Sequence, residues 1–378
     1  MPPAPIITGV GLATALGPTA PHTWQALLAG QHIRAHTRVQ PAQNYTNARV
    51  TNLAIQAAHE ALSHAGWNRS NVAQDDIAVI LATSKGPIEN WLATASQTMA
   101  VQNFSPTFGL SAVADDLAIH VGFPSARRLT ISAACASGLI ALARAAIMLQ
   151  AGEAARALVV AAEASVHPLL VGSFQRLGVL APEGHLCRPF DQNRDGFLIS
   201  EAAAAICLQR SDISEMSSRI RDCARIAIDG FAIGAEAQHL VAGDPTGNTL
   251  EHLLKPLMQR RGGPDLIHAH ATATTADTYE LAAITRALDS THPTTPPILF
   301  SHKAALGHTL GAAGLLAIAI NYQCHQSGKV PANINTTAPL PTASAVLSQS
   351  PVTRPIRRSI ATAAGFGGPV AAIALSTL

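Results

Sequence analysis

The chain has 378 residues, of which 48% are hydrophobic, 13% charged and 4% aromatic, and its formal net charge is +2. This composition excludes a disordered chain, and so small a net charge without Lys/Arg clusters argues against nucleic acid as a partner. At roughly 150 residues per domain, the length is enough for two or three core-sized units. We expect a folded protein whose core consists mainly of Ala, Val, Leu and Ile.

The cysteines and the apolar segments indicate the compartment. The five cysteines, at positions 135, 187, 207, 223 and 324, are odd in number and include no CxxC pair, which argues against a disulfide framework or a zinc site. The N-terminus lacks the basic and apolar regions of a signal peptide. The apolar windows 129–149 and 309–322 are interrupted by polar residues or glycines. Neither is a clean membrane span of about 20 residues, so we expect a cytoplasmic protein without membrane insertion.

Short apolar runs alternate with Ala-rich helical patterns in chain order. Strands are predicted at 6–10, 77–82, 129–133, 157–161, 203–208, 266–270, 298–301, 359–364 and 371–375, and helices at 47–65, 138–151, 276–289 and 311–325. Unbroken apolar strands between helices are typical of a parallel sheet covered on both faces, so the pattern predicts an α/β fold. The polar passage 209–221 marks the boundary between two packed halves, 1–210 and 211–378.

An internal similarity links the two halves. The first half contains a strand at 129–132, a turn of small residues at 133–138 and an apolar helix at 139–149; the second contains a strand at 298–301, a turn at 302–311 and a helix at 312–320. Both helices are rich in Ala and Gly, which indicates close packing. A pseudo-twofold duplication would bring the two turns together, and with them Cys135 and His308.

Cys135 is the first candidate for a nucleophile. A thiol at a helix N-terminus lies near unpaired N–H groups and the positive end of the helix dipole, which favour the thiolate. The plain alternative is a small buried core residue, and position alone leaves both open. The other four cysteines are expected to be core residues.

Two histidines accompany the cysteine in this interpretation. His270 follows the apolar run 266–270, at the carboxyl end of a strand, where open α/β sheets bind ligands. A metal site at His268 and His270 is the weaker alternative: the two side chains share one face of the strand, but no set of carboxylates completes the site. We therefore expect no metal.

Lys303 lies in a nearly uncharged segment five residues before His308, in a chain with lysines at positions 85, 255, 303 and 329 alone. Asp277 or Glu280, three residues apart on one face of a predicted helix, is its expected counter-ion. A purely structural ion pair is the alternative.

The glycine-rich segment Gly365-Phe366-Gly367-Gly368 follows a predicted strand. Glycines let backbone N–H groups approach a ligand oxygen, as an oxyanion hole requires, although an ordinary tight turn has the same composition. Two other patterns carry no function. Gly9 and Gly11 lack the spacing of a dinucleotide-binding motif, and the segment 191–196 lacks the glutamate position of a calcium loop.

Taken together, these segments resemble the elongating β-ketoacyl-acyl carrier protein synthases of the thiolase superfamily. The resemblance covers almost the whole chain in family order and rests on Ala134-Cys135-Ala136-Ser137-Gly138, Arg188-Pro-Phe-Asp191, Arg194-Asp-Gly-Phe197, His270-Ala-Thr-Ala-Thr274, Lys303 to Gly314 and Gly365 to Gly368. It implies a five-layered α/β/α/β/α fold of two pseudo-symmetric halves, usually dimeric.

The resemblance also implies a mechanism. Cys135 takes an acyl group from acyl carrier protein (ACP) as a thioester. His270 and His308 then donate hydrogen bonds to the thioester oxygen of malonyl-ACP during decarboxylation, and the N–H groups of Cys135 and Phe366 form the oxyanion hole. Lys303 supports the histidines.

Further residues match supporting positions of the family. Glu280 and Asp277 are expected to support the histidine region. Thr272, Thr274, Phe366 and Gly367 are expected to contact the substrate or its phosphopantetheine arm. The resemblance implies no metal or redox cofactor.

The catalytic set and the partners follow from the same comparison. Within the superfamily, a Cys–His–His set favours an elongating synthase, since degradative thiolases carry a second cysteine and priming synthases an asparagine at the position of His308.

The expected partners are ACP and a second subunit, in a homodimer or in a heterodimer with a chain-length partner. The region before Cys135 is shorter than usual, which predicts a more open or partner-completed acyl pocket and makes polyene or polyketide assembly as reasonable as fatty-acid elongation. A non-condensing partner subunit and a Cys-dependent hydrolase or acyltransferase remain as alternatives.

Overall fold

The fold is given by a computed structural model that describes residues 4–97, 109–213, 224–260, 263–291, 293 and 295–378. Its main sheet contains the strands β1 (Pro5–Thr14), β2 (Ile77–Ala82), β3 (Arg127–Ile131), β4 (Arg156–Glu163), β5 (Ala202–Arg210), β6 (Ile226–Ala235), β7 (Leu266–His268), β8 (Ile298–Phe300), β11 (Arg358–Ala364) and β12 (Pro369–Thr377). A small separate sheet joins β9 (Lys329–Val330) to β10 (Val352–Thr353). Every predicted strand is present, and β6, β9 and β10 are additions.

The helices are α1 (Ala20–Leu28), α2 (Arg49–Ala65), α3 (Ile88–Gln97), α4 (Leu110–His120), α5 (Ser137–Gln150), α6 (Pro168–Arg176), α8 (Asn248–Met258), α9 (Ala276–Asp289), α10 (Lys303–Leu306) and α11 (Ala313–Ser327). The four predicted helices correspond to α2, α5, α9 and α11. Most of the others span only two or three turns, which is short for the window over which a helical pattern can be recognised. α8 also contains Pro256, and a proline inside a sequence segment argues against a helix there.

The strand order repeats in the two halves of the chain. The main sheet runs β3-β2-β4-β5-β1 and continues β6-β12-β11-β7-β8. In the first half β2 is parallel to β3 and β4, and β5 is antiparallel to β4 and β1. In the second half β7 is parallel to β8 and β11, and β12 is antiparallel to β11 and β6. Each half therefore has the same topology, as a pseudo-twofold duplication requires.

The expectation of a parallel sheet is wrong, because the sheet is mixed. Antiparallel pairs of β5 and β12 stand beside parallel pairs in each half. β5 and β12 are buried along almost their whole length, as are the parallel strands β2 and β4. A strand covered on both faces reads as a continuous apolar run whichever way it points, so the sequence pattern does not reveal its direction.

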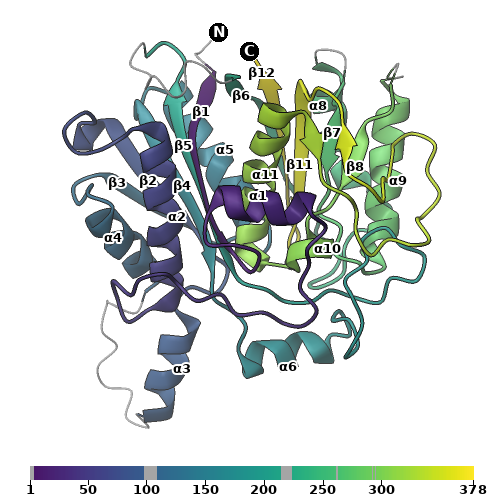
Figure 1. Cartoon of the computed structure of the whole chain (residues 1–378), viewed down its shortest axis with the longest axis horizontal. Helices are drawn as coiled ribbons and strands as arrows, with labels where there is room; N and C mark the ends of the chain where they lie inside the picture. Colours follow the sequence, from purple (N-terminus) through teal and green to yellow (C-terminus); the bar gives the residue numbers. More distant parts are fainter. Residues whose placement is uncertain (1–3, 98–108, 214–223, 261–262, 292, 294) are drawn as a thin grey trace.

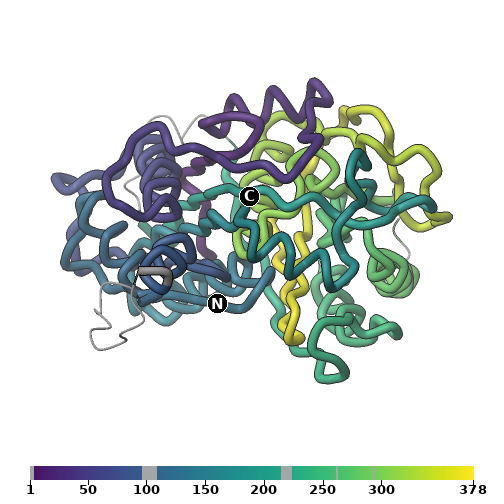
Figure 2. The backbone as a smooth tube through the Cα atoms, turned by 90° about the horizontal axis from the view of Figure 1, so that it is seen from below, coloured from purple at the N-terminus to yellow at the C-terminus, as the bar shows by residue number. Residues whose placement is uncertain are grey.

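The half-sheets and helices form five layers. Helices α5 and α11 lie between the half-sheets, α2 and α4 cover the outer face of the first, and α8 and α9 cover the outer face of the second (Figure 1). Seen from below, the two halves of the chain lie side by side (Figure 2). Three hydrophobic clusters fill the spaces: one around α5 and α11, one around α2 and α4, and one around α8 and α9.

The central helices approach each other at a reciprocal pair of glycines. A Cβ atom on Gly138 would lie 2.7 Å from the backbone N of Leu315, and one on Gly314 would lie 2.8 Å from Leu139 Cγ. Neither position therefore has room for a side chain larger than hydrogen. The expected close packing of these two segments is confirmed.

Two further predictions concern the domain boundary and membrane-spanning segments. The expected boundary after residue 210 lies just before residues 214–223, which are outside the described part of the chain, and the division stays a prediction. Cys223 lies in the same gap. Across the described ranges, none of the helices has the length and apolar character that a membrane crossing requires.

A glycine on β1 provides a stability test of the outer layer. A Cβ on Gly11 would lie 2.0 Å from the carbonyl oxygen of Ala57 in α2. Because backbone atoms cannot move aside cheaply, Gly11→Ala should lower the free energy of unfolding by about 1–3 kcal/mol, measured by urea titration. Gly172→Ala, in exposed helix α6 with nothing within 4 Å, is the control and should keep or raise stability. Equal stability of both variants would contradict this account.

Candidate active site

Cys135 lies in the turn between β3 and α5. Ala134 before it has a φ of 48°, an uncommon conformation for a residue with a side chain. The Ser137 hydroxyl fixes the turn, since it donates to Ala134 O at 2.6 Å and accepts from Ala133 N at 2.8 Å. Cys135 as a residue is half-buried, and it lies in the turn just before α5.

His308 lies in the pseudo-symmetric turn before α11 and contacts the thiol. Its Nε2 is 3.2 Å from Cys135 Sγ. Its backbone is fixed to the segment before β5, where His308 N donates to Leu198 O at 2.7 Å and Ser200 N donates to His308 O at 3.1 Å. The two turns match in detail: Leu310 has a φ of 46°, four residues before Gly314, as Ala134 stands four before Gly138. The predicted meeting of Cys135 and His308 is present.

His270 completes the group from a third segment, directly after β7. Its ring lies 5.5 Å from that of His308, at an interplanar angle of 80°. Its backbone N–H donates to Glu280 Oε1 at 2.8 Å and to Thr362 Oγ1 at 2.9 Å. The imidazole of His270 is thus positioned through its main chain.

Glu280 and Asp277 support the turn after β7 through backbone N–H groups. Glu280 also accepts from Ala271 N at 2.7 Å and from the Thr362 hydroxyl at 2.8 Å. Asp277 accepts from the N–H groups of Thr272 at 2.8 Å, Ala273 at 3.1 Å and Phe190 at 2.8 Å. Burial raises the pKa of Asp277 to about 6 and also raises the pKa of Glu280.

The partner of the Lys303 ammonium group differs from the expectation. This ammonium group donates to the carbonyl oxygen of His270, and within the described part of the chain it forms no ion pair with Glu280 or Asp277. The two carboxylates are already occupied by backbone N–H groups. Glu280 acts on Lys303 at longer range and partly opposes the lowering of the Lys303 pKa by burial.

The protonation state of the thiol also differs from the expectation. Burial raises the pKa of Cys135 to about 12, although Lys303 and Lys85 lower it by charge attraction. Burial likewise holds the pKa values of His270 and His308 well below 6.5. The resting pair is therefore a neutral thiol beside a neutral imidazole, which can accept the thiol proton.

The glycine-rich segment packs directly against the nucleophile turn. A Cβ on Gly365 would lie 3.0 Å from the backbone N of Cys135, and the following residue, Phe366, packs against the same hydrophobic cluster as Cys135. The Phe366 ring is half-buried and lies 6.1 Å from the Phe174 ring. Gly367 is exposed, and its N–H donates to Leu240 O at 2.8 Å.

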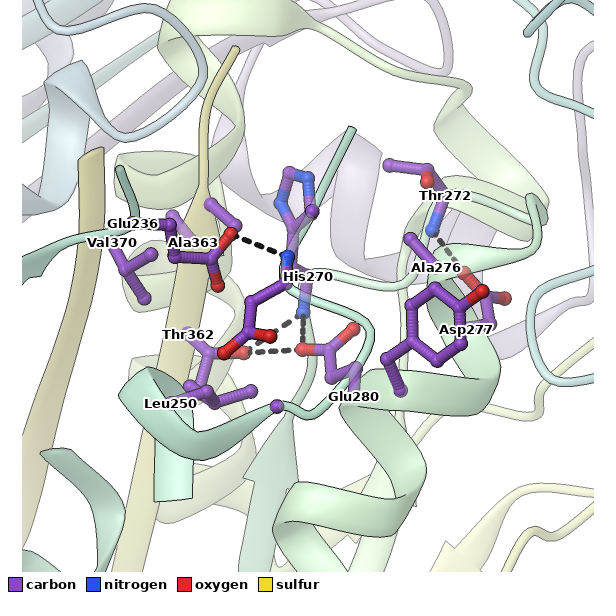
Figure 3. Close-up of a pocket in the computed structure, with 15 residues that line it drawn as sticks. Glu236, Leu250, His270, Thr272, Ala276, Asp277, Glu280, Thr362, Ala363 and Val370 are labelled. Atoms are coloured by element: carbon purple, nitrogen blue, oxygen red, sulfur yellow. Dashed lines mark hydrogen bonds between the residues drawn. The ribbon is translucent and has the colours of Figure 1, made fainter. Parts of the chain in front are cut away.

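The remaining predicted contact residues line the turn after β7. The hydroxyls of Thr272 and Thr274 are 3.0 Å apart, the first buried and the second half-buried. Thr272, His270 and Glu280 border a pocket of about 60 Å³ (Figure 3). Four carboxylates line this pocket, from Glu236, Asp244, Asp277 and Glu280.

Sequence reasoning missed several groups beside the thiol. Glu163, at the end of β4, is fully buried and accepts from the Thr83 hydroxyl at 3.0 Å and the Ser165 hydroxyl at 2.6 Å. Phe197 was noted as part of a motif, but its ring contact with His308, at 5.0 Å, was not. Contacts between segments this far apart leave no spacing signal.

The side chain of His268 has partners of its own. Its Nδ1 is 2.8 Å from Asn321 Oδ1 and its Nε2 is 2.7 Å from His302 Nδ1. Over the described residues, no group of three or more His, Cys, Asp or Glu side chains is arranged to hold a metal ion.

The chain matches a known family over most of its length. The β-ketoacyl synthase N-terminal domain matches residues 34–213 and the C-terminal domain of the same family matches residues 226–337. A 3-oxoacyl-[acyl-carrier-protein] synthase 2 of Mycobacterium leprae is 27% identical over 417 residues, covering 98% of this chain and 96% of that protein. The tetracenomycin polyketide synthase ketoacyl synthase alpha subunit of Streptomyces glaucescens is 27% identical over 385 residues, covering 89% and 88%.

Solved structures share the fold. A type II polyketide synthase acyl carrier protein complex with its ketosynthase matches with a TM-score of 0.86 and 22% identity, over 100% of both chains. The ishigamide ketosynthase/chain length factor matches with a TM-score of 0.84 and 23% identity, also over 100% of both. The expected thiolase-like α/β/α/β/α fold is confirmed. With both family domains present in order, the chain belongs to the β-ketoacyl synthase family of acyltransferases.

Proposed function

We propose that the chain is a β-ketoacyl-ACP synthase that extends an acyl group by two carbons through decarboxylative condensation with malonyl-ACP. The observation that carries this proposal is the 3.2 Å contact between His308 Nε2 and Cys135 Sγ, with the His270 ring beside it. These three side chains come from the two pseudo-symmetric halves and meet at one point.

The first step is acyl transfer to Cys135. As the thiol attacks the acyl-ACP carbonyl carbon, its proton passes to His308 Nε2. The new S–C bond forms at Cys135 while the bond to the carrier sulfur breaks, and the leaving thiolate takes the proton back. The backbone N–H groups of Cys135 and Phe366 hold the carbonyl oxygen as negative charge develops on it.

The second step is condensation. Malonyl-ACP loses CO₂, and its thioester oxygen takes the charge of the enolate. Neutral His270 and His308 stabilise this charge through ring N–H groups, His308 in the tautomer that carries its proton on Nε2 once Cys135 is acylated. The enolate carbon attacks the acyl carbonyl, a C–C bond forms, and Cys135 leaves as thiolate. One proton from solvent restores the thiol in each cycle.

Supporting groups fix this geometry. Lys303 holds the His270 carbonyl, while Glu280 and Asp277 hold the N–H groups of the same turn. We assign Thr272, Thr274 and Gly367 to contacts with the phosphopantetheine arm. Beyond that arm, which the carrier brings, the proposed reaction calls for no cofactor.

ACP and a second subunit are the proposed partners, in the cytoplasm. The second subunit is another copy of the chain or a chain-length partner. β8 at one end of the main sheet is covered, because Leu299 N donates to Val346 O at 2.9 Å. β3 at the other end has β2 as its sole neighbour among the described strands. A strand edge that is unpaired among the described residues can pair with a strand of another subunit.

A non-condensing chain-length or scaffold subunit is the second candidate. It is favoured by the fold similarity to a ketosynthase/chain length factor. The contact between Cys135 and His308 argues against it, because a scaffold needs no activated thiol.

Replacement of the nucleophile tests the proposed function. Wild-type protein, an acyl-ACP and malonyl-ACP should give a β-ketoacyl-ACP two carbons longer, and Cys135→Ala should give none, because no acyl-enzyme forms. Mass spectrometry of the carrier reports the product, and intact-protein mass reports the acyl-enzyme. Cys324→Ala, in the core of the central layer, controls for loss of a cysteine as such. A wild-type protein that is never acylated, alone or with a chain-length partner, would exclude a synthase; acylation followed by free acid would identify a hydrolase.

The two histidines should affect the two steps differently. His270→Ala should slow condensation by about 10²–10⁴-fold while acylation of Cys135 falls less than tenfold, because the His308–Cys135 contact remains. His308→Ala should slow both steps. Single-turnover measurements of acyl-enzyme formation and of product formation separate them. Equal losses in both steps for His270→Ala would contradict this division.

The pH profile should reflect neutral imidazoles. Because burial lowers the His308 pKa well below 6.5, His308 stays able to accept the Cys135 proton as the pH falls from 8 to 6.5. Protonation removes this ability only as the pH falls through the lowered pKa. The kcat/KM for acyl transfer should therefore be level through pH 6.5 and decline well below it, with folding monitored by circular dichroism. A decline centred at pH 6.5 would contradict the burial argument.

A further inference from the structure

Lys85 is a cation at the active site that the proposed mechanism does not use. Of the other lysines, Lys255 pairs with Glu251 at 2.6 Å, Lys329 is exposed, and Lys303 donates to the His270 carbonyl. The Lys85 side chain is half-buried, and among the described residues its ammonium group has no acceptor and no carboxylate partner. The ammonium group is not fully enclosed, so water reaches it in the free protein and an oxygen of a ligand can replace that water.

The backbone around Lys85 is firmly held. Its N–H donates to Glu163 Oε1 at 3.3 Å, and Gly86 N donates to the Thr83 hydroxyl at 3.0 Å. Thr83 N donates at 3.1 Å to the carbonyl oxygen of Ile131, the last residue of β3. Lys85 therefore follows β2 at the same sheet edge where Cys135 follows the neighbouring parallel strand β3.

The same loop borders the paired turn of the second half. A Cβ on Gly311 would lie 2.7 Å from Ser84 N and 2.8 Å from Glu163 Oε1, and one on Gly138 would lie 3.2 Å from the Gly311 carbonyl oxygen. This chain of contacts joins the Lys85 loop to the helix that begins after Cys135. The ammonium of Lys85 is also near enough to the Cys135 thiol to act on it by charge.

Glu163 accepts hydrogen bonds from the backbone of this loop, but it forms no ion pair with the Lys85 ammonium. Its Oε1 accepts from the Thr83 hydroxyl and the backbone N–H groups of Ser84 and Lys85, and its Oε2 accepts from the Ser165 hydroxyl. Its oxygens are used to fix the loop. The described residues therefore leave the Lys85 ammonium free to take an oxygen of a bound molecule in place of water.

The remaining surroundings of the thiol are apolar. Cys135 packs with a cluster that contains Phe174, Phe197, Leu310 and Phe366. An acyl group on Cys135 would have aromatic and aliphatic side chains of this cluster beside it, and the loop that carries the Lys85 ammonium lies at the end of the neighbouring strand. Such a pairing favours an acyl group with one polar end over a plain alkyl chain.

We propose that Lys85 is a specificity residue that binds a carboxylate or ketone oxygen of the acyl group on Cys135, so that oxygen-bearing acyl groups are preferred over alkyl groups of equal length. This inference rests on the proposed function. It concerns the acyl group and not the malonyl carboxylate, because a cation that stabilised that carboxylate would oppose decarboxylation.

The test compares three acyl groups of four carbons, succinyl, acetoacetyl and butyryl, each carried on the same ACP. The rate of Cys135 acylation is measured by intact-protein mass spectrometry. Wild type should prefer succinyl to butyryl by at least about tenfold, since a charge-assisted hydrogen bond contributes at least that factor, with acetoacetyl between them. Lys85→Met, which keeps the length and removes the charge, should bring the succinyl-to-butyryl ratio to about one. Lys85→Arg should restore most of the preference.

Lys329→Met, at an exposed site on β9, is the matched control and should keep the wild-type ratio. Equal rates for the three acyl groups in wild type would overturn the inference and leave the proposed function intact. So would a Lys85→Met variant that slows all three groups by the same factor, which would make Lys85 a general activator of the thiol. Absence of acylation by any of the three, with or without a chain-length partner, would instead overturn the proposed function.

Discussion

The close approach of α5 and α11 is the constraint on which the active site depends. Gly138 and Gly314 allow each helix to meet the backbone or side chain of the other at a distance that no Cβ would permit. Because each helix begins directly after a functional turn, the contact also fixes the distance between those turns. A helix pair held apart by ordinary side chains would separate Cys135 from His308 by more than hydrogen-bond reach. The site is thus a consequence of how the two halves pack in the central layer.

Two buried carboxylates perform the same task on opposite sides of this layer. Glu163 holds the N–H groups of Ser84 and Lys85 after β2, and Glu280 holds those of His270 and Ala271 after β7. The two strands occupy matching places in the repeated topology, although the glutamates come from a strand and a helix respectively. Each carboxylate satisfies orphan donors at a strand end, where an unpaired N–H would be costly. Backbone placement, more than charge pairing, is therefore what these acids supply.

Much of the fold and site could be predicted from the sequence, and the failures have physical causes. The pairing of Cys135 with His308 was accessible because both stand in strand–turn–helix segments with the same small residues. Strand direction was not, because strands buried on both faces lack an alternating pattern. The acceptor of Lys303 was missed for a different reason: every residue offers a carbonyl, whereas a sequence displays only the charged candidates. The Cys135 pKa was misjudged because the helix-end effect can be read from position, but burial depends on the whole fold.

The arrangement of charges gives a reason why Lys303 forms no ion pair with Glu280 or Asp277 among the described residues. The proposed reaction brings in a malonyl carboxylate, moves its charge to an enolate oxygen and leaves it on the Cys135 sulfur, while burial keeps both imidazoles neutral. An ammonium paired directly with Glu280 would have its field cancelled within a few ångströms. Hydrogen-bonded to the His270 carbonyl instead, Lys303 keeps a field that acts on the thiol and on both histidines. That field favours the enolate and the Cys135 thiolate, and it does so most strongly where water is excluded.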